Sequence, residues 1–482
     1  LIIAFLIFKT HAKIKCLKND LCITIAFNMM KQLFFSISFL MLILLSSACG
    51  SGQEKGFSNS KIYPHVNCTA DTNLNYALYL PPQYEKGKPL PLLILFDSHG
   101  DGLLPVNLFS DEASKYGFII AGSNNSKNGM AMQQTTAIYR SMLADLTARF
   151  SIEKKAVYLC GFSGGSRVAG SVAITEGGIA GVVGCGAGLP GINQQPASPF
   201  SYLAVVGNQD FNFTEMKMLD ESLEQAGFTH HLLVFDGIHQ WPPKELVPDI
   251  FAWLKLDAMR QQAIPAERIF INQFIEKNDQ AANVLATAGK FSEQLDTYTK
   301  MKHYLQGLTD IAPLDSEIKR LSAEKSVIAY REQQQQMLTL EQKLQQDYLP
   351  QIPAQGTAWW ALETNRLSAL AKQTEKPELS QVYKRLLGSL SMNSYMYCNN
   401  ALKQRDLDAS ARFIEIYRLV DPSNAEHRVM AAKLAAMKQD KAGVLNALQQ
   451  AFALGFKDKA RIKSDPDFVP FLQDESFKKL IQ

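Results

Sequence analysis

Residues 156–165 of this chain read Ala-Val-Tyr-Leu-Cys-Gly-Phe-Ser-Gly-Gly, and this stretch decides the fold that we expect. Its apolar start is typical of a buried strand, and the small residues that follow at 166–173 are typical of a helix. Between strand and helix stands Gly-x-Ser-x-Gly, with Ser163 at its centre. Glycines on both sides of a serine allow a tight turn that projects the hydroxyl from the end of the strand. The pattern therefore predicts a nucleophile elbow with Ser163 as the nucleophile.

Apolar runs and amphipathic segments on both sides of the elbow predict strands that alternate with helices. The expected strands are 61–69, 74–80, 91–97, 116–121, 156–160, 181–185, 202–206 and 231–235, and the expected helices include 130–150, 214–226 and 245–261. This alternation favours an α/β fold with a mostly parallel sheet. Functional groups in such a fold gather at the carboxyl ends of the strands.

Two of those strand ends carry an acid and a base. The seventh expected strand is followed by Gly-Asn-Gln-Asp, ending at Asp210, and the eighth by Asp-Gly-Ile-His, ending at His239. The chain order serine, aspartate, histidine is that of an α/β-hydrolase triad. In this hypothesis His239 accepts the proton of Ser163 while Asp210 orients the imidazole. Asp236 is the alternative acid.

With these residues the chain resembles the α/β-hydrolase superfamily, in particular dienelactone hydrolases and esterases of the polyhydroxybutyrate-depolymerase type. The matching motifs are Gly161-Phe162-Ser163-Gly164-Gly165, Gly207-Asn208-Gln209-Asp210 and His239-Gln240-Trp241-Pro242, and the resemblance covers residues 61–262. It implies a serine hydrolase that acts on a small or polymeric ester. We expect no cofactor and no metal. The alternatives are a catalytically silent scaffold and a serine peptidase of the same fold.

The oxyanion of such a reaction needs two preset hydrogen-bond donors. One candidate is the backbone N–H of Gly164, at the start of the helix after the elbow. The loop after the third expected strand carries His99-Gly100, which resembles the family's His-Gly motif. The second candidate donor is therefore the N–H of Asp101 or of Gly100, with the Asp101 carboxylate turned away from the oxyanion.

The mouth of the site is expected at the same edge of the sheet. The polar loop 123–129 follows the fourth strand, and we assign its Asn124 and Asn125, together with Trp241, to substrate binding. A plain solvated turn is the alternative for this loop. The connection at 186–199 is too short to carry a helical cap, which predicts an open site without a lid.

The first 60 residues indicate export. We expect residues 1–28 to be upstream translation and residues 29–49 to be a signal peptide, with an apolar run before Ser-Ser-Ala-Cys. This ending resembles a bacterial lipoprotein signal, which implies lipidation of Cys49 and a tether at 50–60. The alternative is a plain secretory signal. The expected location is the periplasm or the cell surface, with the membrane reached only through the lipid.

Composition sets further limits. The 482 residues are 46% hydrophobic and 20% charged, which leaves room for two or three domains. A formal net charge of +3, without a basic run, gives no indication of nucleic-acid binding. The cysteine spacing suggests neither a metal site nor a disulfide framework, and we expect Cys160 and Cys185 to be buried thiols.

Residues 265–482 form a second domain in this interpretation, because glycine becomes sparse and helical periodicity dominates. The expected helices include 267–288, 291–308, 316–347 and 378–390. Residues 407–422 align with 441–456 at a shift of 34, the spacing of tetratricopeptide repeats. We expect a helical-repeat domain that binds a protein partner or a polymer, or that covers the open site. A generic helical bundle is the alternative.

Overall fold

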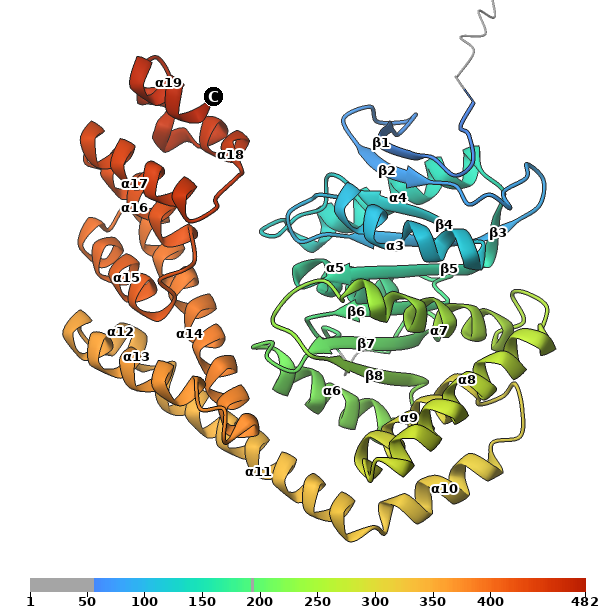
Figure 1. The fold of residues 1–482 in the computed structure, drawn as a ribbon. Helices are drawn as coiled ribbons and strands as arrows, with labels where there is room; N and C mark the ends of the chain where they lie inside the picture. The colour runs from blue at the N-terminus through green and yellow to red at the C-terminus, as the bar shows by residue number, and fades with distance from the viewer. Residues whose placement is uncertain (1–55, 192–194) are drawn as a thin grey trace, which may run out of the picture. The chain divides into compact units, whose positions relative to one another are not determined.

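An eight-stranded sheet forms the centre of the fold in the computed structural model, which describes residues 56–191 and 195–482. Its strands are β1 (Ile62–Asn67), β2 (Asn75–Tyr79), β3 (Leu90–Phe96), β4 (Ile119–Ser123), β5 (Ile152–Phe162), β6 (Gly181–Cys185), β7 (Ser201–Gly207) and β8 (His230–Phe235). They lie in the order β1-β2-β4-β3-β5-β6-β7-β8, which Figure 1 shows as a stack of arrows. Each of these strands was predicted, with ends that differ by a few residues. Cys49 and the leader lie outside the described residues.

The sheet is mostly parallel, as the sequence predicts. Strand β2 pairs antiparallel with β1 and β4, whereas the pairs from β4 through β3 to β8 are all parallel. Strand β7 is buried along its length, and β3 and β5 are buried from Pro91 and Ala156 to their ends, which explains the continuous apolar sequences there. Parallel strands have their carboxyl ends at one edge, so the residues after β3, β5, β7 and β8 are brought together.

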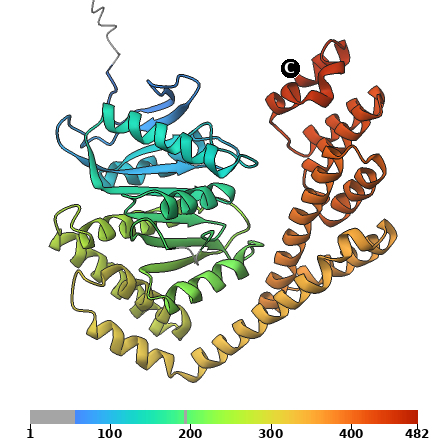
Figure 2. The ribbon, with the colours of Figure 1, turned by 180° about the vertical axis from the view of Figure 1, so that it is seen from behind.

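Helices cover both faces of the sheet (Figures 1 and 2). They are α3 (Leu103–Tyr116), α4 (Met132–Arg149), α5 (Gly164–Thr175), α6 (Phe213–Gln225) and α7 (Val247–Arg260), with a 3-10 turn at Lys244–Leu246. Phe109 of α3 and Phe251 of α7 contact each other in the core on one face. Helix α3 was missing from the sequence prediction.

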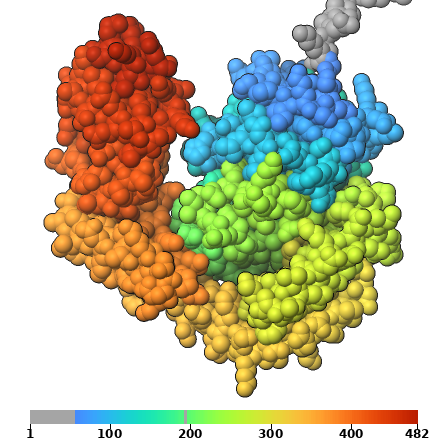
Figure 3. Space-filling model, in the orientation of Figure 1, coloured from blue at the N-terminus to red at the C-terminus, as the bar shows by residue number. Residues whose placement is uncertain are grey.

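The core of the sheet does not end at residue 264, where the sequence analysis places the domain boundary. Helices α8 (Arg268–Thr287), α9 (Phe291–Leu305) and α10 (Ala312–Ser322) follow. Their buried side chains, among them Phe274 and Tyr304, belong to the same hydrophobic cluster as the strands. The space-filling view shows the yellow-green atoms of this segment packed against the green ones (Figure 3). The boundary drawn from composition is therefore too early, because an amphipathic helix can pack against the sheet as well as against other helices.

The remaining helices build two further clusters. They are α11 (Lys325–Tyr348), α12 (Gln351–Ala354), α13 (Thr357–Ala371), α14 (Pro377–Lys403), α15 (Leu407–Val420), α16 (Glu426–Met437), α17 (Lys441–Ala453), α18 (Lys459–Ser464) and α19 (Glu475–Ile481), with a 3-10 segment at Pro466–Phe471. One cluster contains buried residues of α12 to α16, and the other contains those of α16 to α19. The expected helix 316–347 is divided, because α10 ends at Ser322 and Glu324 is extended.

Two observations concern the surroundings of the protein. Across the described ranges, no helix has both the length and the apolar character that crossing a membrane requires. The four cysteines in this part, Cys68, Cys160, Cys185 and Cys398, are buried and unpaired. Burial is the main cause that raises the pKa of the Cys160 thiol, and a hydrogen bond with Cys185 adds to it.

Candidate active site

Three side chains from three strand ends form one hydrogen-bonded chain. His239 Nε2 lies 2.9 Å from Ser163 Oγ, and His239 Nδ1 lies 2.9 Å from each oxygen of the Asp210 carboxylate. Asp210 is completely buried, while the imidazole is 17% exposed. A nucleophile within hydrogen-bond reach of a base that a third group orients is the arrangement that acyl transfer requires. The predicted triad residues therefore lie together.

The elbow sequence explains how Ser163 is held. Its backbone is at φ 55° and ψ −118°, a conformation that L-residues rarely adopt, and its N–H donates to Cys185 O at 2.8 Å. A Cβ on Gly161 would lie 2.1 Å from Gly165 O, and one on Gly165 would lie 2.0 Å from Phe96 O. Both glycines are needed because backbone atoms occupy the space of their side chains.

The loop after β7 fixes the acid. Asp210 Oδ1 accepts a hydrogen bond from the N–H of Asn212 at 2.8 Å, in addition to its contact with His239. The alternative acid, Asp236, instead accepts a hydrogen bond from Gln209 Nε2 at 3.2 Å. The geometry thus brings Asp210 to the imidazole and not Asp236.

Two aromatic rings pack against the imidazole. The ring centroid of Phe162 lies 4.7 Å from that of His239, and the centroid of Phe211 lies 4.2 Å from it. Phe162 belongs to the elbow motif, whereas Phe211 was not singled out in the sequence. Its position directly after Asp210 is the only signal that could have found it. The two rings restrict the imidazole to one orientation.

The two sequence-based candidates for the second oxyanion donor, Gly100 and Asp101, lie in the loop between β3 and α3. The expectation for Gly100 is wrong, because its N–H donates to Asp97 O at 3.2 Å and is therefore not free for an oxyanion. A Cβ on Gly100 would lie 3.4 Å from the carbonyl oxygens of Asn124 and Ser126, in the loop after β4. The Asp101 carboxylate accepts from Leu104 N–H at 3.2 Å, at the start of α3. The carboxylate is therefore engaged with the start of α3.

Ser98, which the sequence analysis did not single out, is a further candidate donor. It is buried, and no acceptor for its backbone N–H is found in the parts of the chain that the structure describes. Buried N–H groups without a partner are rare in folded proteins. The Ser98 carbonyl accepts from Asn128 N–H at 2.8 Å, and the Asn128 side chain in turn lies over Gly164. Ser98 is linked to the elbow in this way.

Asp97 fixes the loop that carries Ser98. Its Oδ1 accepts from His99 N–H at 2.8 Å, and its Oδ2 accepts from Trp241 Nε1 at 3.0 Å. Burial raises the pKa of Asp97, but hydrogen bonds from His99 and Trp241 outweigh it and lower the pKa below the ordinary value. Trp241, predicted to bind substrate, uses its polar atom here, and its ring packs 5.5 Å from that of Phe162.

Asn124 and Asn125, in the loop after β4, make hydrogen bonds within the protein. Asn124 Nδ2 donates to Asn75 Oδ1 at 2.7 Å, and Asn124 Oδ1 accepts from Gly102 N–H at 3.1 Å. Asn125 Oδ1 accepts from Asn75 N–H at 2.8 Å. Both side chains therefore hold the neighbouring strand and loop together, and their assignment to substrate binding stays a prediction.

Asn128, in the same loop, is the side chain that reaches the elbow. A Cβ on Gly164 would lie 1.7 Å from Asn128 Oδ1, so the carboxamide rests directly on this glycine. The side chain is exposed and makes no hydrogen bond within the described ranges. An exposed carboxamide beside the nucleophile is free to bind a substrate.

One buried arginine from the helical region contacts the loop of the acid. Arg385 of α14 donates from Nη1 to Asn208 O at 2.7 Å and from Nε to Glu341 of α11 at 2.6 Å. Its guanidinium also lies 4.5 Å from the ring centroid of Phe213. Asn208 in turn accepts from Gly237 N–H at 3.2 Å through its side chain. Arg385 therefore supports both loops that carry the acid and the base.

Comparisons with known proteins concern the fold alone. No protein-family model and no curated protein matches the chain. Among solved structures, an esterase from the archaeon Pyrobaculum calidifontis is 13% identical, with 41% of this chain and 86% of that chain covered and a TM-score of 0.33. An S-formylglutathione hydrolase from Staphylococcus aureus is 15% identical, with 41% and 98% covered and a TM-score of 0.34. An esterase from the planctomycete Thermogutta terrifontis is 12% identical, with 37% and 84% covered and a TM-score of 0.30.

A mostly parallel eight-stranded sheet with an elbow after β5 is the α/β-hydrolase fold, and a C-terminal all-helical region follows it.

Proposed function

We propose that this protein is a serine hydrolase that acts on ester bonds. The observation that supports this most strongly is the chain of 2.9 Å contacts from Ser163 Oγ through His239 to Asp210. A serine hydroxyl is a poor nucleophile at neutral pH, and a base within this distance removes its proton as attack begins. The buried Asp210 carboxylate holds the imidazole in the required tautomer and stabilises the imidazolium.

The proposed reaction has two stages. Ser163 Oγ attacks the carbonyl carbon, and His239 takes the serine proton and passes it to the departing alkoxide, which leaves an acyl-serine. Water then attacks this acyl group with His239 as the base, which releases the acid and restores the serine. The N–H of Gly164 and that of Ser98 or of Asp101 would stabilise the oxyanion in both stages, and each such donor contributes roughly 10²–10³ in rate.

A fluorophosphonate probe tests this function. The wild-type protein should be labelled and should hydrolyse p-nitrophenyl acetate, whereas Ser163→Ala should do neither. Ser171→Ala, on the same helix and outside the triad, is the matched control and should behave as wild type. A folded wild-type protein that is neither labelled nor active would instead favour a non-catalytic scaffold. Faster turnover of aminoacyl anilides than of esters would favour a peptidase.

We also propose that the protein is exported and anchored through a lipid on Cys49, as the signal-like segment before this cysteine suggests. Bacterial cells fed an alkyne fatty acid should yield labelled wild-type protein in the membrane fraction. Cys49→Ser should remove both the label and the membrane association. An unlabelled wild-type protein would support a plain secretory signal.

We further propose that α15 to α18 are tetratricopeptide-like repeats that bind a protein partner. Helices α15 and α17 begin at residues 407 and 441, and each is followed by a shorter helix. An experimental structure in which the pair α15–α16 cannot be superposed on α17–α18 would contradict the repeat assignment.

A further inference from the structure

A pocket of about 390 Å³ lies where the hydrolase part meets α11 and α14. We call it the seam pocket, and the residues that matter here are Phe211, Asn212, Glu215, Met218, Gln345 and Asn393. Its volume is within the range of roughly 300–1,000 Å³ that small-molecule sites occupy. Two separate parts of the chain form its walls, so it can enclose a ligand.

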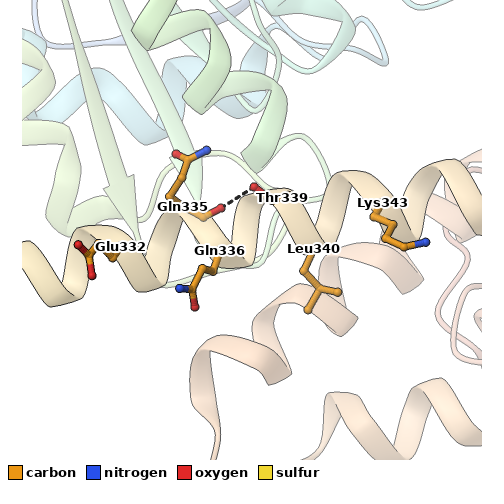
Figure 4. A pocket seen from close by; sticks show the side chains of 6 residues that line it. All are labelled: Glu332, Gln335, Gln336, Thr339, Leu340 and Lys343. Atoms are coloured by element: carbon orange, nitrogen blue, oxygen red, sulfur yellow. Dashed lines mark hydrogen bonds between the residues drawn. The ribbon is translucent and has the colours of Figure 1, made fainter.

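A second hollow lacks that property. It measures about 530 Å³ and is lined by Glu332, Gln335, Gln336, Thr339, Leu340 and Lys343, all of α11. Figure 4 shows these side chains along one helix, with the bond from Thr339 Oγ1 to Gln335 O, 2.9 Å long, as a dashed line. Because no second element closes this hollow, we assign no site to it.

The seam pocket adjoins the triad directly. Phe211, one of its lining residues, stacks on the imidazole with 4.2 Å between ring centroids. Asn212, the next lining residue, donates its backbone N–H to Asp210 at 2.8 Å. The pocket therefore shares Phe211 and Asn212 with the surroundings of the base and the acid.

Three of the four carboxamides that line the pocket, those of Asn212, Gln345 and Asn393, each donate one hydrogen bond to an oxygen of the protein. Asn212 Nδ2 donates to Gly186 O at 2.7 Å, Asn393 Nδ2 donates to Ser389 O at 2.8 Å, and Gln345 Nε2 donates to Glu341 at 3.3 Å. Each of these amide nitrogens thus makes one hydrogen bond to the protein and keeps a second N–H, because a carboxamide NH2 group carries two donors. The three amide oxygens accept no hydrogen bond within the described part of the chain. The pocket therefore offers acceptors and donors together, and it calls for a ligand whose groups can both donate and accept.

The pocket has no unpaired charged side chain among its lining residues. Glu215 is its one acidic lining residue, and its two oxygens accept from Arg167 Nη2 at 2.8 Å and from Gly188 N–H at 2.9 Å. An ammonium ion would lose its hydration without gaining a free counter-charge. A hydroxyl group both donates and accepts, so it can satisfy these carboxamides at a much lower cost in desolvation than an ion. The side chains of Phe211 and Met218 can pack against C–H groups.

We propose that the seam pocket binds the neutral, hydroxyl-rich part of an ester substrate, so that the substrate class is an O-acylated carbohydrate. This inference rests on the proposed ester hydrolysis and adds the substrate class to it. The helical region then contributes to specificity through Gln345 of α11 and Asn393 of α14.

Three acetate esters test the inference: p-nitrophenyl acetate, a monoacetylated methyl glucoside and acetylcholine. Gln345→Leu and Asn393→Leu should each lower kcat/KM for the sugar ester about 3- to 10-fold, the effect of one lost hydrogen bond. The rate with p-nitrophenyl acetate should stay unchanged. Gln346→Leu, an exposed neighbour on α11 outside the pocket, is the matched control.

Two results would overturn the proposal. Equal losses with all three esters would show a structural role for these side chains, and a preference for acetylcholine would show a cation site. Calorimetry with Ser163→Ala and xylotriose separates this proposal from the hydrolase proposal, because binding needs no turnover. If Ser163→Ala binds xylotriose, Asn393→Leu abolishes that binding and the wild-type protein hydrolyses no ester, the sugar pocket stands and only the proposed hydrolase activity is refuted. If the wild-type protein hydrolyses esters but neither binds xylotriose nor prefers the sugar ester, only the proposed role of the seam pocket is refuted.

Discussion

Replacement of Arg385 by methionine should destabilise the protein and lower its activity together. Arg385 and Glu341 form a 2.6 Å ion pair in which the two side chains are 4% and 0% exposed. Removing one partner of a buried pair costs about 3–5 kcal/mol, because the other charge is left without compensation. Burial, the largest influence on Glu341, raises its pKa, so part of this cost is avoided when the carboxyl takes up a proton. We therefore expect a loss near the lower limit, about 3 kcal/mol.

A double variant separates the two effects. Arg385→Met combined with Glu341→Met removes both charges, and such replacements are often neutral in stability. The Asn208 carbonyl still lacks its donor in this variant, so the loop of Asp210 loses a support. We expect stability close to wild type together with a reduced kcat/KM for p-nitrophenyl acetate.

Urea unfolding followed by tryptophan fluorescence measures the stability, and steady-state kinetics measures the activity. Arg418→Met is the matched control, because its pair with Glu415 is 36% and 42% exposed and should contribute less than about 1 kcal/mol. An Arg385→Met variant as stable as wild type would refute the reasoning. So would a double variant no more stable than the single one.

Three further outcomes are expected. Gly164→Ala should leave the unfolding midpoint nearly unchanged but lower kcat/KM by about 10-fold or more, because the new Cβ displaces the Asn128 carboxamide; wild-type kinetics would show that this carboxamide is idle. Asp210→Asn should reduce kcat by about 10³–10⁴, whereas Asp236→Asn should have little effect; similar losses in both would contradict the assignment. Burial lowers the pKa of His231 and of His303 in the folded state, so the unfolded chain binds more protons below pH about 6.5 and stability falls as the pH drops further. His303→Gln should make the decline of the urea midpoint between pH 7.5 and pH 5 shallower, and an unchanged slope would exclude this pair as its cause.

Local patterns were sufficient to predict much of the fold and the meeting of the triad. Continuous apolar runs identify buried strands, and residues that directly follow parallel strands must meet at one edge. Ser163, Asp210 and His239 were found in this way. No three-dimensional information was needed, because the topology alone brings these positions together.

Other features depend on contacts that no local pattern contains. Arg385 meets Asn208 across 177 positions, and nothing in either segment indicates the other. The loop after β4 offers three asparagines, and only its folded path shows that Asn128 rests on the elbow while Asn124 and Asn125 hold strand and loop together. The amphipathic face of α8 fits any apolar partner, which is why composition placed the domain boundary too early.

The reduced cysteines have a consequence for how this protein could mature outside the cytoplasm. Cys160 and Cys185 lie on adjacent strands beneath the elbow, and both side chains are inaccessible once the sheet has formed. A thiol with a raised pKa carries little thiolate, the form that oxidants attack. An exported chain would nonetheless meet oxidising enzymes while still unfolded. Rapid closure of the sheet around these sulfurs would then compete with mispaired cross-links, and folding speed rather than equilibrium stability would set the yield of active protein.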